Sequence, residues 1–147
     1  MGTLTLPTSG SVYVDANSVI YGVEKHPVYG PLLQPLWDAA TAKVLEIVSS
    51  DLVLMETLIG PLKSGDKALA STYEAFFQQP QTRLIPITHA ILRTAAQLRA
   101  TTKLKTPDAL HAATGIDSAC ALFVTNDAGY RNVAGLPVVV VDDLLKP

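Results

Sequence analysis

Short apolar runs alternate along the chain with longer segments in which apolar residues recur every three or four positions. The runs predict strands at Ser11–Val14, Lys43–Val48, Arg83–Ile87, Ala121–Thr125 and Pro137–Val141. For the second of these, continuation of the preceding helix is an alternative. Short buried strands separated by helices are typical of an α/β protein with a largely parallel central sheet. We therefore predict one sheet of about five strands.

The periodic segments predict helices over Val19–Glu24, Leu32–Ala42, Asp51–Leu62, Asp66–Gln79, Ala90–Thr101 and Asp108–Ala119. Ser49 and Ser50 are expected to cap the third helix, and Thr106 followed by Pro107 is a strong start signal for the last. The Pro- and Gly-containing stretch His26–Pro31 is expected to be a loop. Residues 11–147 are predicted to form a single domain, with residues 1–10 as a flexible leader.

The amino-acid composition limits the classes of protein to which the chain can belong. The chain has 147 residues, of which 48% are hydrophobic and 16% charged, so one sizeable core is feasible and part of the surface is expected to be apolar. That surface makes oligomerisation a reasonable expectation. The net charge of -2 argues against a protein that coats nucleic acid by neutralising phosphates. It argues less against an enzyme that contacts a short stretch of RNA through bound metal ions.

The cysteine content and the length of the apolar stretches exclude further classes of protein. The single cysteine, Cys120, excludes an intramolecular disulfide and a cysteine-based zinc cluster, and its apolar neighbours predict a buried core thiol. No apolar stretch approaches the roughly 18 residues of a membrane span, and the N-terminus does not resemble a secretory signal. We expect a cytoplasmic protein with no membrane partner.

Four acidic residues occupy positions where ligand sites form. Asp15 follows the first predicted strand and Asp127 follows the fourth, and parallel sheets bind ligands outside the carboxyl ends of their strands. Glu56 and Asp108 lie on predicted helices, with Glu56 among apolar residues. A buried carboxylate needs compensation. Two unit charges 4 Å apart repel by about 4 kcal/mol at an effective dielectric of 20, so four converging acids need a raised pKa or a bound cation.

Hard oxygen donors without Cys or paired His favour Mg²⁺ or Mn²⁺ over zinc. Such an ion supports the hydrolysis of phosphodiesters. Each acid also has a simpler explanation: Asp108 could complement a helix dipole, Asp127 could belong to a turn, and Asp15 could cap a helix. Glu56 is the hardest to explain by structure alone. His111, three residues after Asp108, is interpreted as a structural histidine, although a metal or general-base role is conceivable.

Four segments resemble the motifs of PIN domains, in the order that the family has them. They are Val14–Tyr21, Ser49–Leu58, Thr106–Ala113 and Val124–Asp127. The resemblance implies a three-layer α/β/α fold, Mg²⁺- or Mn²⁺-dependent endoribonuclease activity and a homodimer. At this size the chain looks most like the VapC toxins of toxin–antitoxin pairs, which a small antitoxin silences by inserting a segment into the active site.

Carried over by position, the resemblance makes Asp15, Glu56, Asp108 and Asp127 the catalytic metal ligands. Asn17 and Thr125 become supporting polar groups. Among the few basic residues, Lys103, Lys105 and Arg131 lie close to the third and fourth acids in sequence, so they could bind RNA. Their interpretation as solvated surface charge is at least as good.

Three other functions remain open from the sequence. A non-toxin PIN nuclease of RNA maturation or decay would carry the same motifs. A catalytically inert PIN-like binding module is disfavoured because all four acids are present. A receiver-type phosphoacceptor domain is more distant, because the acid pair that such domains place after the first strand is missing.

Overall fold

Five parallel strands form one sheet in the order β3-β2-β1-β4-β5 in a computed structural model that describes residues 2–147. The strands are β1 (Ser11–Val14), β2 (Glu46–Ser50), β3 (Thr82–Ile85), β4 (Leu122–Thr125) and β5 (Val138–Val140). The helices are α1 (Ala16–Val23), α2 (Tyr29–Thr41), α3 (Leu52–Ser64), α4 (Lys67–Phe77), α5 (His89–Thr101) and α6 (Thr106–Asp117), with short 3-10 helices η1 (Ala128–Asn132) and η2 (Val141–Leu145).

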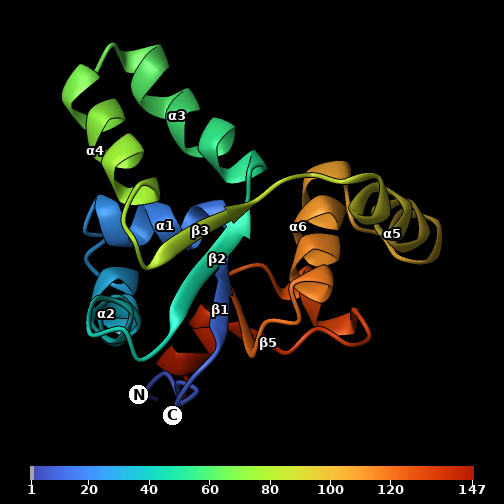
Figure 1. Cartoon of the computed structure of the whole chain (residues 1–147). Helices are drawn as coiled ribbons and strands as arrows, with labels where there is room; N and C mark the ends of the chain where they lie inside the picture. Colours follow the sequence, from blue (N-terminus) through green and yellow to red (C-terminus); the bar gives the residue numbers. More distant parts are fainter. Residues whose placement is uncertain (1) are drawn as a thin grey trace.

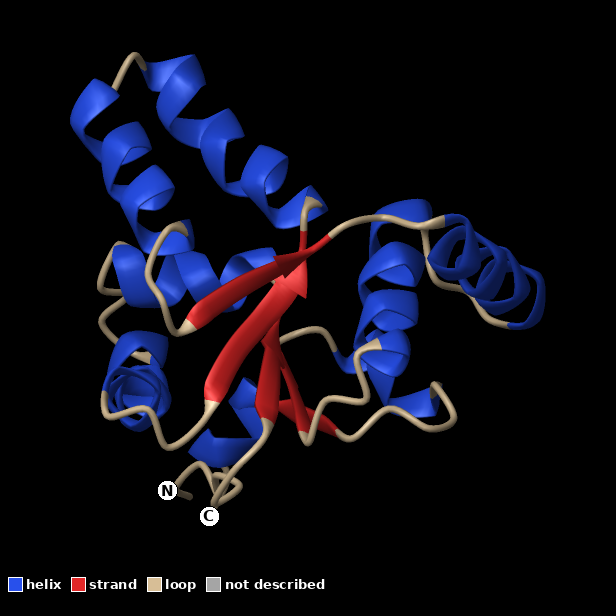
Figure 2. Cartoon of the chain, viewed as in Figure 1, coloured by secondary structure: helices blue, strands red, loops and turns tan. Residues whose placement is uncertain are grey.

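Helices cover both faces of this sheet, as Figures 1 and 2 show. α1, α2 and the α3–α4 hairpin lie on one side, and α5 and α6 on the other. The predicted three-layer α/β/α fold with a parallel sheet is confirmed. The α3–α4 hairpin projects beyond the sheet (Figure 1).

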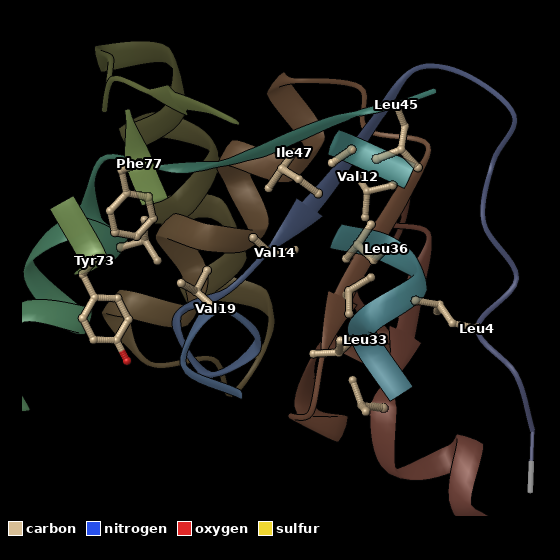
Figure 3. Close-up of a cluster of buried hydrophobic side chains, with 14 residues drawn as sticks. Leu4, Val12, Val14, Val19, Leu33, Leu36, Leu45, Ile47, Tyr73 and Phe77 are labelled. Atoms are coloured by element: carbon tan, nitrogen blue, oxygen red, sulfur yellow. The ribbon is translucent and has the colours of Figure 1, made fainter. Parts of the chain in front are cut away.

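The two faces of the sheet have separate hydrophobic clusters. Val12 and Val14 of β1 pack toward α1 and α2 in the first cluster (Figure 3), whereas Tyr13 between them packs in the second cluster, with residues of α5 and α6. Successive side chains of a strand point to opposite faces. Because both faces are covered, β1 contains no polar residue between Ser11 and Asp15, and this explains its uninterrupted apolar pattern.

The second strand begins three residues later than predicted. Lys43 has a left-handed backbone with φ 61°, so the chain turns after α2 and enters β2 only at Glu46. Ser49 and Ser50 consequently lie inside the strand and are buried. The prediction that both cap the third helix is wrong: Asp51 occupies the N-cap without a side-chain cap bond, although the Ser50 hydroxyl still accepts from the Leu52 N–H at 3.1 Å.

Several helix starts also differ from the prediction. α2 begins at Tyr29, inside the stretch predicted to be a loop, because Pro31 falls in its first turn, where the missing N–H costs no helical hydrogen bond. In α6 the N-cap is Lys105 and Thr106 is the first helical residue. α1 likewise starts earlier than predicted, directly after Asp15.

Residues 2–10 form neither helix nor strand, but they contact the domain. Leu4 is buried in the first hydrophobic cluster, and the Gly2 N–H donates to the Leu144 carbonyl at 2.6 Å. The flexibility of this leader in solution stays a prediction. Cys120 is a free, buried thiol, as expected. None of the helices within residues 2–147 has both the length and the apolar character needed to cross a membrane.

Gly115 sets how closely α6 approaches the sheet. A Cβ on this residue would lie 2.8 Å from the Phe123 ring and 3.0 Å from the Leu136 side chain. We expect Gly115→Ala to lower the free energy of unfolding by about 1–3 kcal/mol, because an added methyl overpacks a well-filled core. Urea denaturation measures this loss.

Phe123→Leu provides the control, since it removes the ring that the new methyl would meet. The double variant should then lose less stability than the sum of the two single losses. If the two losses in the free energy of unfolding simply added, a clash between the new methyl and the Phe123 ring would not be their cause.

Candidate active site

The site lies where the strand order reverses. From β1 the chain adds β2 and β3 on one side, and β4 and β5 on the other. β1 pairs directly with β4, with Val14 opposite Val124. The carboxyl ends of these two strands therefore lie side by side, and such a reversal point leaves a crevice for ligands. Asp15 stands at the end of β1, and Asp127 follows the end of β4.

One small cavity of about 100 Å³ collects all four predicted acids. Its lining residues are Asp15, Ala16, Asn17, Glu56, Asp108, His111, Asp127 and Tyr130. The acids reach it from four separate places: the end of β1, α3, the first turn of α6 and the segment after β4. No lysine or arginine is among these lining residues of the described chain, so protein cations do not neutralise the acids inside the cavity.

Asp15 is held by a dense set of hydrogen bonds. It is the N-cap of α1: its Oδ1 accepts from the Ser18 N–H at 3.1 Å and from the Ser18 hydroxyl at 2.9 Å. Its Oδ2 accepts from the Thr125 hydroxyl at 2.5 Å. Burial raises the pKa of this carboxyl, and the bonds from Thr125 and Ser18 oppose that rise. The outcome is a raised pKa, because desolvation is the largest contribution.

Thr125 connects Asp15 to Asp127. Besides donating to Asp15, its hydroxyl accepts from the Asp127 N–H at 3.0 Å. Asp127 in turn caps η1, with its Oδ1 accepting from the Gly129 N–H at 2.8 Å. Thr125 is fully buried, so this hydroxyl fixes the spacing of the two strand ends without reaching solvent.

Asp108 lies in the first turn of α6. Its Oδ1 accepts from the Tyr130 hydroxyl at 3.2 Å. Burial raises its pKa, and the negative charge of Asp127 raises it further. The acids are thus close enough to repel one another, as the sequence predicted for a converging set.

Glu56 reaches the cavity from α3 and meets His111 of α6. The Glu56 Oε1 lies 2.5 Å from the His111 Nε2, and His111 is buried, with 2% of its surface exposed. On its other side the ring meets the Tyr13 hydroxyl, 2.6 Å from Nδ1. Thus Glu56 is hydrogen-bonded within the protein rather than left alone among apolar residues.

The donor set fits a hard divalent cation. The four carboxylates supply oxygen ligands of the kind that Mg²⁺ and Mn²⁺ prefer. Within residues 2–147, however, no three His, Cys, Asp or Glu side chains are close enough to hold an ion as they stand. Asp127 and Glu56 are engaged with Gly129 and His111, so a cation would have to draw the carboxylates together.

The three predicted RNA-binding cations divide into two groups. Lys103 and Lys105 line a second, larger cavity of about 670 Å³, which shares Asp108 and Asp127 with the first. Arg131 instead makes a two-pronged ion pair with Asp143, at 2.8 and 2.7 Å. The two lysines therefore lie beside the acids, whereas Arg131 is already neutralised by its partner.

The predicted supporting groups, Asn17 and Thr125, both lie close to the acids, and other polar groups there were not predicted. Asn17 is exposed and lines the acidic cavity, and Thr125 contacts Asp15. Ser18, Tyr13 and Tyr130 were not anticipated as supporting groups, although Ser18 stands at the spacing of a helix cap. His111 was interpreted as structural, and only its position one helical turn after Asp108 pointed to the site.

Burial of Asp15 leads to a prediction about stability without metal. Its folded-state pKa lies above the ordinary value of 3.8. A carboxyl with a raised pKa contributes stability below about pH 3.8, and this is lost as the pH rises through the folded pKa. Asp15→Asn has no such loss and keeps a good N-cap. In chelator, the variant should therefore be more stable than the wild type at neutral pH.

Urea denaturation at a series of pH values measures this difference, which should shrink toward acid pH. Asp117→Asn at the exposed end of α6 is the control, for which little change is expected. An Asp15→Asn protein that is less stable than the wild type at neutral pH would contradict the raised pKa of Asp15.

Comparisons with known proteins agree on the fold. A family model described as "PIN domain" matches residues 12–136. No curated protein sequence matches the chain. A chain from the crystal structure of VapBC2 from Rickettsia felis, bound to a DNA fragment from its promoter, is similar with a TM-score of 0.72. The two are 22% identical over 88% of this chain and 97% of that one.

Two further solved structures are similar. A toxin–antitoxin complex from Klebsiella pneumoniae has a chain with a TM-score of 0.67 and 20% identity, over 88% of this chain and 97% of that one. VapBC-5 from Mycobacterium tuberculosis gives a TM-score of 0.54 and 16% identity, over 90% and 97%. At these identities the similarity establishes the arrangement of the elements.

Proposed function

Because the chain belongs to the PIN domain family, we propose that it is a Mg²⁺- or Mn²⁺-dependent endoribonuclease. PIN domains are generally nucleases. The observation that carries the proposal is the convergence of Asp15, Glu56, Asp108 and Asp127 on one cavity. We propose these four as the metal ligands, directly or through water, with Asn17 and Thr125 as supporting groups.

The protein's contribution is to hold negative oxygens in fixed places against their own repulsion. Ser18 and Thr125 orient Asp15, and Tyr130 orients Asp108. A divalent cation bound there would supply a Lewis acid that lowers the pKa of water and neutralises charge developing on a phosphate. Preorganised ligands of this kind support hydrolysis of a phosphodiester.

We further propose that this nuclease is the toxin of a toxin–antitoxin pair and acts in the cytoplasm. Similarity to chains from toxin–antitoxin complexes supports an antitoxin partner. α3 also presents Met55, Ile59 and Leu62, which are 57%, 44% and 70% exposed. Their spacing places them on one side of the helix. An exposed apolar stripe beside Glu56 is consistent with binding another protein, either the antitoxin or a second copy in a homodimer.

The first test is cleavage of a panel of structured RNAs by purified protein with Mg²⁺ or Mn²⁺. We expect endonucleolytic products that disappear in excess chelator. Asp108→Asn should reduce the cleavage rate at least about 100-fold, because it removes charge that holds the metal and stabilises the transition state. Gel analysis of end-labelled RNA measures the rate.

Asp117→Asn, on the same helix but exposed, should retain wild-type cleavage. In cells, expression of the wild type without a partner should arrest growth, and Asp108→Asn should not. Cleavage without arrest would favour a non-toxin PIN nuclease. Absence of both cleavage and Mn²⁺ binding in calorimetry would indicate an inert PIN-like module and overturn the proposal.

The second test concerns the lysines beside the acids. Changing both Lys103 and Lys105 to Gln should raise KM for RNA and leave kcat nearly unchanged, because phosphate contacts contribute mainly to binding. The salt dependence of binding should also become shallower, by a slope of about 0.7 per lost contact with single-stranded RNA.

The matched control changes Lys63 and Lys67 to Gln. These exposed lysines lie at the tip of the α3–α4 hairpin, which projects away from the sheet (Figure 1). An equal rise of KM in both double variants would show that the effect reflects net charge and not the cavity.

A further inference from the structure

We propose that His111 is a positioning residue that orients Glu56, and that Tyr13 sets the proton on its ring. This inference rests on the proposed function only for its consequence in catalysis. The series of hydrogen bonds itself does not depend on that function. It runs from the Ser50 N–H to the Tyr13 hydroxyl at 3.1 Å, then to His111 Nδ1 at 2.6 Å and from Nε2 to Glu56 at 2.5 Å.

The partners of the ring determine which nitrogen carries the proton. An ionised Glu56 offers only lone pairs, so the nitrogen facing it, Nε2, must donate. In the neutral ring Nδ1 is then an acceptor, and the Tyr13 hydroxyl must donate to it. The Ser50 N–H donates to the Tyr13 oxygen, which leaves the phenolic proton free for this bond.

The positions of these hydrogen-bonded residues explain why they would matter for the active site. Tyr13 lies in β1 two residues before Asp15, and His111 lies one helical turn after Asp108. His111 also binds one oxygen of Glu56, and Glu56 comes from the separate helix α3. This series of hydrogen bonds therefore fixes the acid on α3 relative to the acids that follow β1 and lie on α6. Groups that orient a metal ligand typically change metal affinity or activity about 10–100-fold when removed.

Close packing restricts the movement of the Tyr13 and His111 side chains. The Tyr13 ring stacks on Phe123 with centroids 4.7 Å apart and an interplanar angle of 5°, and both Tyr13 and His111 are buried. Because neither side chain can rotate freely in a close-packed interior, Glu56 is held by a rigid donor. A solvated histidine would lose this advantage.

Nuclear magnetic resonance of the metal-free protein tests the chain without reference to activity. Of the three histidines, His111 is the buried one, which aids assignment of its ring nitrogens. We expect a protonated Nε2 and an unprotonated Nδ1. Glu56→Gln should shift the Nε2 resonance, and Tyr13→Phe should shift Nδ1 while keeping the ring on Phe123. A proton on Nδ1 alone, or resonances that neither variant shifts, would overturn the proposal.

Calorimetry with Mn²⁺ alone tests the consequence. His111→Leu should weaken Mn²⁺ binding about 10–100-fold, and His111→Gln, which keeps a side-chain N–H donor, should recover part of the loss. His89→Leu, an exposed histidine on α5, should leave the affinity unchanged. If His111 acts through Glu56, adding His111→Leu to Glu56→Gln should weaken binding no more than about twofold further.

A full additional loss in that double variant, or no recovery with His111→Gln in a folded protein, would show that His111 is only structural. A wild type that binds Mn²⁺ and has the expected ring proton but cleaves no RNA would refute the proposed nuclease function and leave the positioning role intact. The two proposals therefore fail separately.

Discussion

The parallel pairing of β1 with β4 is the constraint on which the site depends. It places the end of the first strand next to the end of the fourth, although more than a hundred residues separate them along the chain. The strand order reverses at this pair, so the connections leave in opposite directions and open a crevice. Asp15 and Asp127 enter that crevice because Asp15 directly follows β1 and Asp127 lies two residues after the end of β4. Thr125 then joins them through one buried hydroxyl.

Electrostatic repulsion is the second feature that shapes this end of the molecule. Burial raises the pKa of Asp15 and of Asp108, and the negative charge of Asp127 raises that of Asp108 further. Among the described residues, no lysine or arginine lines the cavity to offset this negative charge. Hydrogen bonds from Ser18, Thr125 and Tyr130 stabilise the ionised forms only in part. Such a costly cluster supports the proposal that the site binds a divalent cation, which would offset the repulsion among the carboxylates.

The sequence predicted much of the architecture because local patterns determine it. The apolar run at Ser11–Val14 forms the strand as predicted, since a strand covered on both faces needs no polar residue. The start of β2 was wrong because it depends on a left-handed turn at Lys43, a conformation that a lysine rarely adopts and that no residue pattern signals. That shift carried Ser49 and Ser50 from a helix cap into a buried strand.

By itself, the sequence determined the α/β class, the parallel sheet and the four acids at the positions typical of PIN domains, because periodicity and motif order are local properties. Tertiary structure decided which side chains support those acids. His111 and Glu56 are 55 positions apart, and Tyr13 and His111 are 98 apart, so their contacts depend on how α3, α6 and β1 pack. The same packing left Lys103 and Lys105 beside the acids and paired Arg131 with Asp143. Spacing along a chain does not encode such contacts, because they arise only when distant elements share one core.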